Sequence, residues 1–248
     1  MAGHSKFKNI MHRKGAQDKK RAKLFSRLIR EVSVATKLGL PDPETNPRLR
    51  TAINNALAAN MSKDNIERAI KKNSEGGTNK EIDEVIYEGY GPGGIAIIVD
   101  VVTDNKNRSA SEIRSIFNKY SGNLGTSGSV KHLFQKIGTI VYNNHITSFE
   151  EIFECCLECS VIDIKENNNK YEIETSLEHF QVTLDKLEKK FKIPNFSSID
   201  WKPKTLVKIS DNDAQKLFTL MEKFEDISDV QNITSNADFS NDFLKKIS

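Results

Sequence analysis

The residues best suited to chemistry lie at the N-terminus, and their types favour binding over catalysis. Between Gly3 and Lys14, cationic side chains and histidines are interleaved with one aromatic ring. The stretch has little apolar periodicity, so we expect it to bury little of its surface and to stay available to a partner. Cations contact phosphates and rings stack on bases. The segment therefore predicts nucleic-acid contact through His4, Lys6, Phe7, Lys8, His12, Arg13 and Lys14.

More cations follow on a predicted helix over residues 18–38. Its apolar residues recur at three- and four-residue spacing on an arc roughly 140° wide. The basic residues occupy a separate arc about 100° wide, formed by Lys19, Lys20, Lys23, Arg27 and Arg30. A solvated face or an organellar targeting segment would use the same residue types. The apolar arc suits packing on two later helices and therefore favours a folded, phosphate-binding helix.

The cysteines and histidines do not form a recognisable reactive group. The three cysteines fall between Cys155 and Cys159 and contain one CxxC pair, but no second Cys or His pair follows at zinc-binding spacing. His132, His145 and His179 are far apart and lack partners at motif spacing. We therefore expect helix cysteines that are buried or half-buried. We also expect no catalytic residue, metal, cofactor or small-molecule substrate, and no enzyme activity.

Three loops offer weaker candidates. Residues 89–94 are glycine-rich but lack the Gly-Lys-Ser/Thr ending of a phosphate loop and lead into a predicted strand. A turn that leaves Tyr90 available to a partner is the better interpretation. Residues 104–108 predict a surface loop, in which Lys106 and Arg108 are candidates for a secondary phosphate or RNA contact. Residues 121–129 offer hydroxyls and backbone donors without a base to activate them.

Charge is distributed very unevenly along the 248 residues. The whole chain has a formal net charge of +3. Residues 1–80 hold 18 basic and 7 acidic residues, a net of +11, and residues 81–248 hold 19 basic and 27 acidic residues, a net of −8. This asymmetry indicates a basic module that meets a polyanion, attached to a body that does not. The longest apolar run has five residues, far fewer than the ~20 of a membrane span, so we expect no membrane association.

The periodicity predicts an α+β protein of three domains. Residues 1–79 form a basic domain of three helices, with Asn46-Pro47 as the start of the second helix. Residues 80–136 together with 205–248 form an α+β domain, in which Ser109 and Glu112 predict a capping box. Residues 137–204 read as β-α-β-β-α-β, the ferredoxin-like order, inserted between those flanks. The expected fold is thus a three-helix domain followed by two ferredoxin-like α+β domains, the second inserted in the first.

Several motifs, in this order along the chain, resemble the YebC family. They are MAGHSK (1–6), HRKGAQD (12–18), NPRLR (46–50), YEGYGPGG (87–94), DNKNR (104–108) and GNLG (122–125). Phe7 departs from the pattern because the family usually has tryptophan there. Phenylalanine keeps the stacking face but has no indole N–H donor. The resemblance implies the same three-domain arrangement and a cytoplasmic, non-enzymatic regulator of gene expression.

The resemblance implies a role in either DNA-binding transcriptional regulation or ribosome-associated translation. No presequence precedes Met1, so we expect a bacterial member rather than a mitochondrial one. Lysine dominates the basic arc and acts more as a point charge than as a base reader. The connection over residues 39–46 is also longer than a helix-turn-helix turn. Ribosomal RNA is therefore the favoured partner and DNA the alternative. A protein–protein adaptor with a merely solvated basic segment is a third hypothesis.

Overall fold

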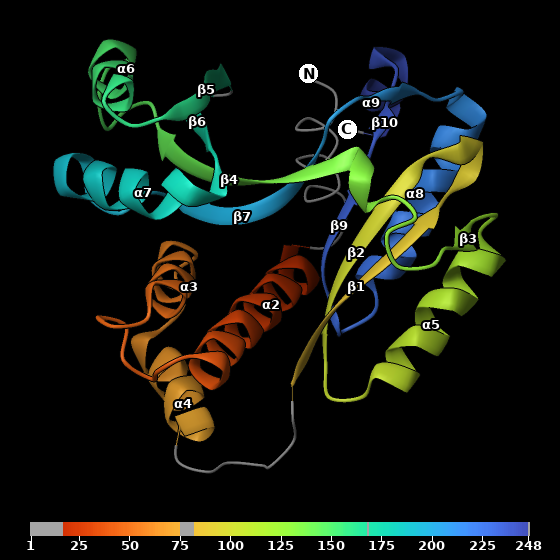
Figure 1. Ribbon diagram of the computed structural model, residues 1–248, viewed down its shortest axis with the longest axis horizontal. Helices are drawn as coiled ribbons and strands as arrows, with labels where there is room; N and C mark the ends of the chain where they lie inside the picture. Colours follow the sequence, from red (N-terminus) through yellow and green to blue (C-terminus); the bar gives the residue numbers. More distant parts are fainter. Residues whose placement is uncertain (1–16, 75–81, 168, 248) are drawn as a thin grey trace. The chain divides into compact units, whose positions relative to one another are not determined.

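The structure, a computed structural model, describes residues 17–74, 82–167 and 169–247 (Figure 1). Side chains are described from Arg21 onward. The chain divides into two compact units. The described residues of the first unit lie mainly in 80–135 and 201–248, and those of the second in 21–79 and 136–200. The predicted fold class is confirmed, with three N-terminal helices followed by α+β structure. The three-domain division and its boundaries stay a prediction.

Three helices begin the second unit, and one asparagine joins two of them. Their bounds are α2 (Gln17–Leu38), α3 (Pro47–Ala58) and α4 (Lys63–Ser74). Asn46 Oδ1 accepts a hydrogen bond from the Leu49 N–H at 3.1 Å, which caps the start of α3. Its Nδ2 donates to the carbonyls of Ala35 and Leu40, each at 2.8 Å, at the end of α2. Buried Asn46 therefore fixes the angle at which α3 leaves α2.

The helices share a small apolar core. Apolar positions at helical spacing on each helix face the other two. The buried members are Val32, Ala35, Leu49, Ala52, Ala56, Met61, Ile66 and Ala69. The three N-terminal helices thus bury their apolar faces against one another in a single core.

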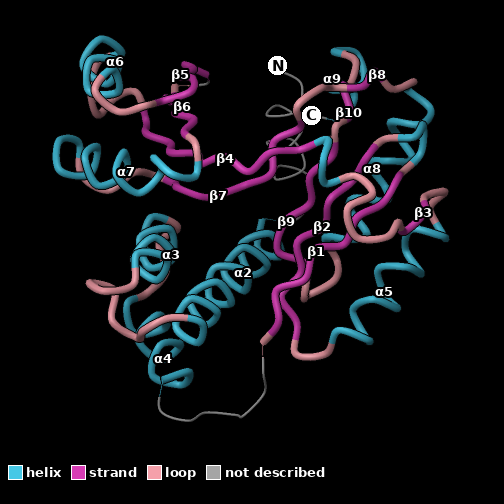
Figure 2. The backbone as a smooth tube through the Cα atoms, viewed as in Figure 1, coloured by secondary structure: helices cyan, strands magenta, loops and turns pink. Residues whose placement is uncertain are grey.

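The elements between residues 134 and 203 form the sheet of the second unit and two of its helices. They are β4 (Phe134–Asn143), α6 (Phe149–Leu157), β5 (Val161–Asn167), β6 (Lys170–Thr175), α7 (Leu177–Phe191) and β7 (Phe196–Pro203). The strand order is β5-β6-β4-β7, and β6 is antiparallel to both of its neighbours. This is the ferredoxin-like β-α-β-β-α-β arrangement (Figure 2). Apolar residues of α6 and α7 pack on the same face of the sheet.

Strand β7 lies at an edge of this sheet, and an asparagine of α3 pairs with it. Asn55 Nδ2 donates to the Ser197 carbonyl at 2.6 Å, and the Ser197 N–H donates to Asn55 Oδ1 at 3.0 Å. The side-chain amide thus makes the pair of bonds that a neighbouring strand would make. An edge strand presents backbone groups of this kind, and Asn55 covers them at Ser197.

Two further polar contacts join α3 to α7. The Arg50 guanidinium pairs with Asp185 at 3.1 Å, and Asn54 Nδ2 donates to Glu188 Oε1 at 3.1 Å. Burial raises the pKa of Glu188 above its ordinary value, although Asn54 and Arg50 oppose this shift. Within the second unit, α3 is thus bound to α7 by polar side chains.

The first unit is built on a four-stranded sheet of order β3-β1-β2-β9. The strands are β1 (Asp83–Tyr90), β2 (Ala96–Thr103), β3 (Asn123–Leu124) and β9 (Val230–Ser235). Helices α5 (Lys106–Lys119) and α8 (Asp211–Glu225) pack on the face that carries Ile97 and Val99. Ala96 and Ile98 point to the other face, where they pack with Phe134 and Trp201. Because both faces of β2 are covered, residues 95–99 are uniformly apolar.

Short elements complete this unit. They are the 3-10 turns η1 (Pro92–Gly94) and η2 (Lys131–Leu133), strands β8 (Val207–Lys208) and β10 (Ala237–Asp238), and helix α9 (Asn241–Ile247). Strands β8 and β10 pair in parallel. Among the described residues, no helix combines the length and the apolar character that a membrane span requires.

One predicted helix start is wrong. Helix α5 begins at Lys106 because extended Asn105 accepts a hydrogen bond from the Arg108 N–H at 3.1 Å. Ser109 therefore lies inside the helix, where it is fully buried. Its hydroxyl contacts Thr103 Oγ1 at 2.8 Å and the Asp229 carboxylate at 3.0 Å. The serine predicted to cap the helix instead belongs to a buried polar network.

Candidate nucleic-acid interface

Most of the predicted N-terminal contacts lie outside the described residues. These are His4, Lys6, Phe7, Lys8, His12, Arg13 and Lys14. Lys19 and Lys20 belong to the first turn of α2, but their side chains also lie outside the description. The predicted contact of these nine residues with nucleic acid stays a prediction.

Three residues of the predicted basic arc can be placed. Lys23, Arg27 and Arg30 follow one another at four- and three-residue spacing along α2, so they share one side of the helix. All three side chains are half-buried rather than fully exposed. The core of the three helices uses Val32 and Ala35 of the same helix. The cationic and core-forming residues of α2 therefore occupy separate positions, but the cations are less open than a solvated face would be.

A second feature of the helical part is the short connection between α3 and α4. Only residues 59–62 separate these helices, a length typical of a helix-turn-helix. Asn60 in this turn has a positive φ of 61°. Helix α4 exposes Lys63, Asn65 and Arg68. The expectation against a helix-turn-helix rested on the longer connection over residues 39–46, whereas the short connection of this length lies between α3 and α4.

The prediction of a surface loop over residues 104–108 is wrong in part, because Lys106 and Arg108 lie in the first turn of α5, which Asn105 caps. Both residues form ion pairs within the first unit. Lys106 Nζ lies 2.9 Å from the carboxylate of Asp83. The Arg108 guanidinium lies 2.9 Å from Asp104 and 2.7 Å from buried Asp229. Hydrogen bonds to these two carboxylates raise the pKa of Arg108. Arg108 thus neutralises Asp229, and a phosphate would have to compete with two carboxylates for it.

Tyr90 is a candidate that is exposed to solvent in the structure. Its ring is 37% exposed, and its hydroxyl donates to the Ser129 carbonyl at 3.2 Å. Strand pairing places Tyr90 opposite Asn123 and Gly89 opposite Leu124. The motifs at residues 87–94 and 122–125, far apart in the sequence, therefore meet at one edge of the sheet.

The three cysteines are buried free thiols on α6 and the turn after it. Burial is the main cause that raises the pKa of Cys155, and it raises the pKa of Cys156 to about 12. A thiol with a raised pKa is a poor nucleophile and a poor metal ligand at neutral pH. In the described part of the chain, no group of three or more His, Cys, Asp or Glu residues is arranged to hold a metal ion.

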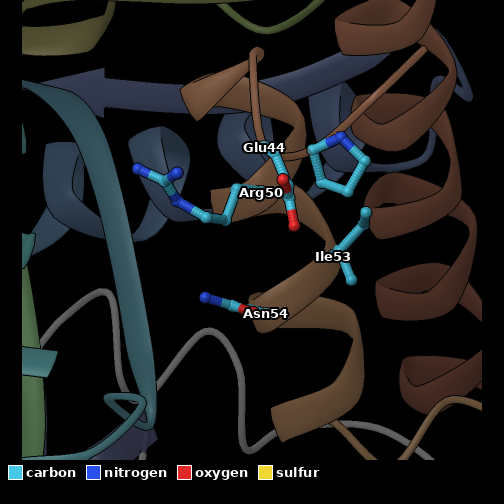
Figure 3. A pocket seen from close by; sticks show the side chains of 5 residues that line it. Glu44, Arg50, Ile53 and Asn54 are labelled. Atoms are coloured by element: carbon cyan, nitrogen blue, oxygen red, sulfur yellow. The ribbon is translucent and has the colours of Figure 1, made fainter. Parts of the chain in front are cut away.

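A hollow of about 490 Å³ lies beside α3 in the second unit (Figure 3). It is lined by Pro43, Glu44, Arg50, Ile53 and Asn54. Arg50 and Asn54 point to one side of the helix and Ile53 to the other (Figure 3). The two polar side chains already bind α7. The hollow therefore borders a structural contact and does not bring together an acid, a base and a nucleophile.

Comparisons with known proteins agree with this architecture. Residues 5–76 match the family described as the TACO1/YebC protein N-terminal domain, and residues 82–237 match the TACO1/YebC second and third domain. The chain is also similar to the crystal structure of a conserved hypothetical protein from Aquifex aeolicus. That protein has 43% sequence identity and a TM-score of 0.81, over 90% of this chain and 92% of the other. The chain therefore belongs to the TACO1/YebC family, whose members are generally proteins of a transcription- or translation-regulating type.

Proposed function

We propose that this protein is a non-enzymatic regulator of gene expression that binds RNA, most directly on the ribosome, in the bacterial cytoplasm. Its basic N-terminal part contacts phosphates, and its acidic α+β body orients that part. The observation that carries the proposal is the charge division between a net of +11 over residues 1–80 and a net of −8 over residues 81–248. A polyanion attracts the basic part and repels the acidic part. The protein therefore binds the polyanion through its N-terminal part.

RNA is favoured over duplex DNA by the types of the basic residues. Lys19, Lys20 and Lys23 outnumber the arginines of the predicted arc, and lysine gives a point charge where arginine gives a bidentate fork. Specific reading of duplex DNA uses side chains that pair with base edges in the major groove. The N-terminal histidines and Phe7 suit unpaired bases, which are accessible for stacking in folded RNA.

One observation favours a DNA-binding transcriptional regulator as the second candidate. The four-residue connection before α4, and the exposed Lys63, Asn65 and Arg68 on that helix, fit a helix-turn-helix reader. Arg68, however, donates to Asp64 on its own helix and to Asn65 Oδ1 at 2.9 Å. Its guanidinium would have to leave these partners to reach a base.

Salt dependence tests the proposal. If the basic part neutralises on the order of five phosphates, affinity should fall by roughly 10²–10³ between 50 and 200 mM salt. We expect this for RNA, together with weaker, sequence-insensitive binding to DNA, in fluorescence anisotropy with labelled oligonucleotides. A flat salt profile for both nucleic acids would instead favour a protein–protein adaptor. Tight preference for one duplex sequence would favour the transcriptional regulator.

A further inference from the structure

A buried carboxylate organises an exposed loop of the first unit. Glu88, on β1, is only 3% exposed. Its Oε1 accepts from the Gly128 N–H at 2.7 Å, and its Oε2 accepts from the N–H groups of Val130 at 2.9 Å and Lys131 at 2.8 Å. Burial raises the pKa of Glu88, but these three donors and the nearby Lys131 charge outweigh it and lower the pKa below the ordinary value. We call residues 122–132 the braced loop.

Two glycines let the braced loop pack closely, Gly122 against the end of β1 and Gly125 against Ser129 of the loop itself. A Cβ atom on Gly122 would come within 2.8 Å of the Tyr90 carbonyl oxygen, and one on Gly125 within 2.3 Å of Ser129 Oγ. The Gly125 N–H also donates to the Glu88 carbonyl at 2.8 Å. The loop is therefore held by its backbone from both ends. These hydrogen bonds and close contacts define the conformation of the loop.

The surface of the braced loop carries cations, rings and hydroxyls. Thr126, Ser127 and Gly128 are exposed, as are Lys131 and His132. The ring of His132 is held by contact of its Nδ1 with the Gly128 carbonyl at 3.4 Å. The loop thus presents a polar, partly cationic surface, and the residues that form it are close together in the sequence.

Two more residues extend this surface. Tyr90 adds a part-exposed ring through its bond to Ser129, and exposed Lys204 is brought in by the bond from its N–H to the Leu133 carbonyl at 2.9 Å. Lys131 Nζ lies 5.7 Å from the centre of the Trp201 ring. No ion pair within the described ranges includes Lys131, His132 or Lys204. The carboxylate of Glu88 lies near Lys131, but its oxygens already accept from backbone amides.

These side chains match the needs of single-stranded RNA better than those of a protein or a small anion. Exposed lysines such as Lys131 and Lys204 can contact a phosphate backbone, and aromatic rings beside them can stack on unpaired bases. Burying a carboxylate costs desolvation free energy. A loop that the carboxylate holds in place loses less conformational entropy when it binds a partner. We infer that the braced loop, with Tyr90 and Lys204, is a second RNA-binding surface, located on the α+β body and separate from the basic N-terminal part.

This inference rests on the proposed function. One set of variants distinguishes a failure of the inference from a failure of the proposed function. The probe is a fluorescent oligouridylate of twelve nucleotides, and its binding to the full-length protein is measured. Lys131→Gln with Lys204→Gln should weaken binding on the order of tenfold at 100 mM salt and lower the salt slope by about 1.4, at ~0.7 per phosphate contact. The control, Lys119→Gln with Lys216→Gln, makes the same charge change on α5 and α8 and should leave affinity within about twofold. Tyr90→Ala with His132→Ala should weaken binding about fivefold or more.

Ultraviolet cross-linking of the wild-type complex gives an independent readout, and we expect RNA adducts on peptides that contain Tyr90 or His132. Wild-type affinity in both loop variants, with adducts only elsewhere, would overturn the inference. If Lys19→Gln with Lys20→Gln still weakened binding in that case, the proposed function would stand without it. Absence of any salt-dependent binding by the wild type would overturn the proposed function and the inference together.

Discussion

Two buried carboxylates of the first unit, Glu88 and Asp229, each accept several hydrogen bonds. Glu88 accepts only from backbone N–H groups, whereas Asp229 accepts from the hydroxyls of Thr103 and Ser109 and from the Arg108 guanidinium. A buried charge is tolerated only with such compensation. Asp229 therefore ties β9 to the start of α5, and Glu88 ties the braced loop to β1.

The residue-scale prediction concerns Glu88→Gln. The amide keeps the size of the side chain but turns one acceptor into a donor that faces a backbone N–H. We expect the free energy of unfolding to fall by roughly 1.5–3 kcal/mol, the range for hydrogen bonds to a charged group. Chemical denaturation at pH 7 measures the loss, and Glu112→Gln, at an exposed position on α5, is the matched control.

The same variant predicts a pH dependence. Because the folded pKa of Glu88 lies below its ordinary value of 4.5, its stabilisation is present above that value and is lost as the pH falls through the folded pKa. The stability gap between wild type and Glu88→Gln should be constant from pH 6 to 8 and shrink below about pH 4. A gap that widens on acidification would contradict this account of the brace.

The sequence predicted side-chain roles less well than element types. Asn46 was identified as a cap because its chemistry is local, needing only a backbone N–H three residues ahead. Ser109 was misassigned because its partner Asp229 lies 120 residues further along the chain. Glu88 gave no local signal at all, since its three donors come from a loop about forty residues away.

At the scale of elements, local sequence pattern was sufficient to predict two consecutive elements of the second unit. The strand at 170–175 and the helix at 177–191 have the predicted bounds, since alternation and helical periodicity are strong there. The predicted strand at 130–134 is instead a 3-10 turn followed by the start of β4. There Glu88 takes up the N–H groups of Val130 and Lys131 that a strand ladder would use.

The element-scale prediction concerns the contact between α3 and the edge strand β7. Asn55→Ala removes both bonds to Ser197 and leaves a buried backbone N–H and carbonyl without that partner. We expect a loss of about 1–3 kcal/mol in the free energy of unfolding. Asn118→Ala, on an exposed part of α5, is the control. Equal stability of the two variants in thermal denaturation would show that Asn55 does not hold α3 to the sheet.

At the scale of the whole molecule, the central feature is the division of charge along the sequence between basic residues 1–80 and acidic residues 81–248. Counting residues is enough to find this division, because net charge requires no knowledge of contacts. The half-buried state of Lys23, Arg27 and Arg30 could not be predicted, since helical periodicity assigns a face but not what covers it. The surface on the braced loop likewise depends on contacts between distant segments.

The first whole-molecule prediction concerns deletion of residues 1–15. We expect the deletion to weaken binding to RNA or ribosomes while the thermal unfolding midpoint stays nearly unchanged, because a segment with little apolar periodicity adds little to a core. Differential scanning calorimetry and anisotropy on the same preparation measure both quantities. A large fall in the midpoint would show that these residues are structural.

Co-sedimentation with ribosomes tests the central claim most directly. Purified full-length protein is centrifuged with bacterial ribosomes, beside DNA binding measured with competitor at the same salt concentration. We expect the wild type to pellet with ribosomes and to bind DNA weakly and without sequence preference. Charge reversal at Lys19, Lys20 and Lys23 should weaken both interactions, because both use phosphate contacts. Tight discrimination of one duplex sequence, with no protein in the ribosome pellet, would contradict the account.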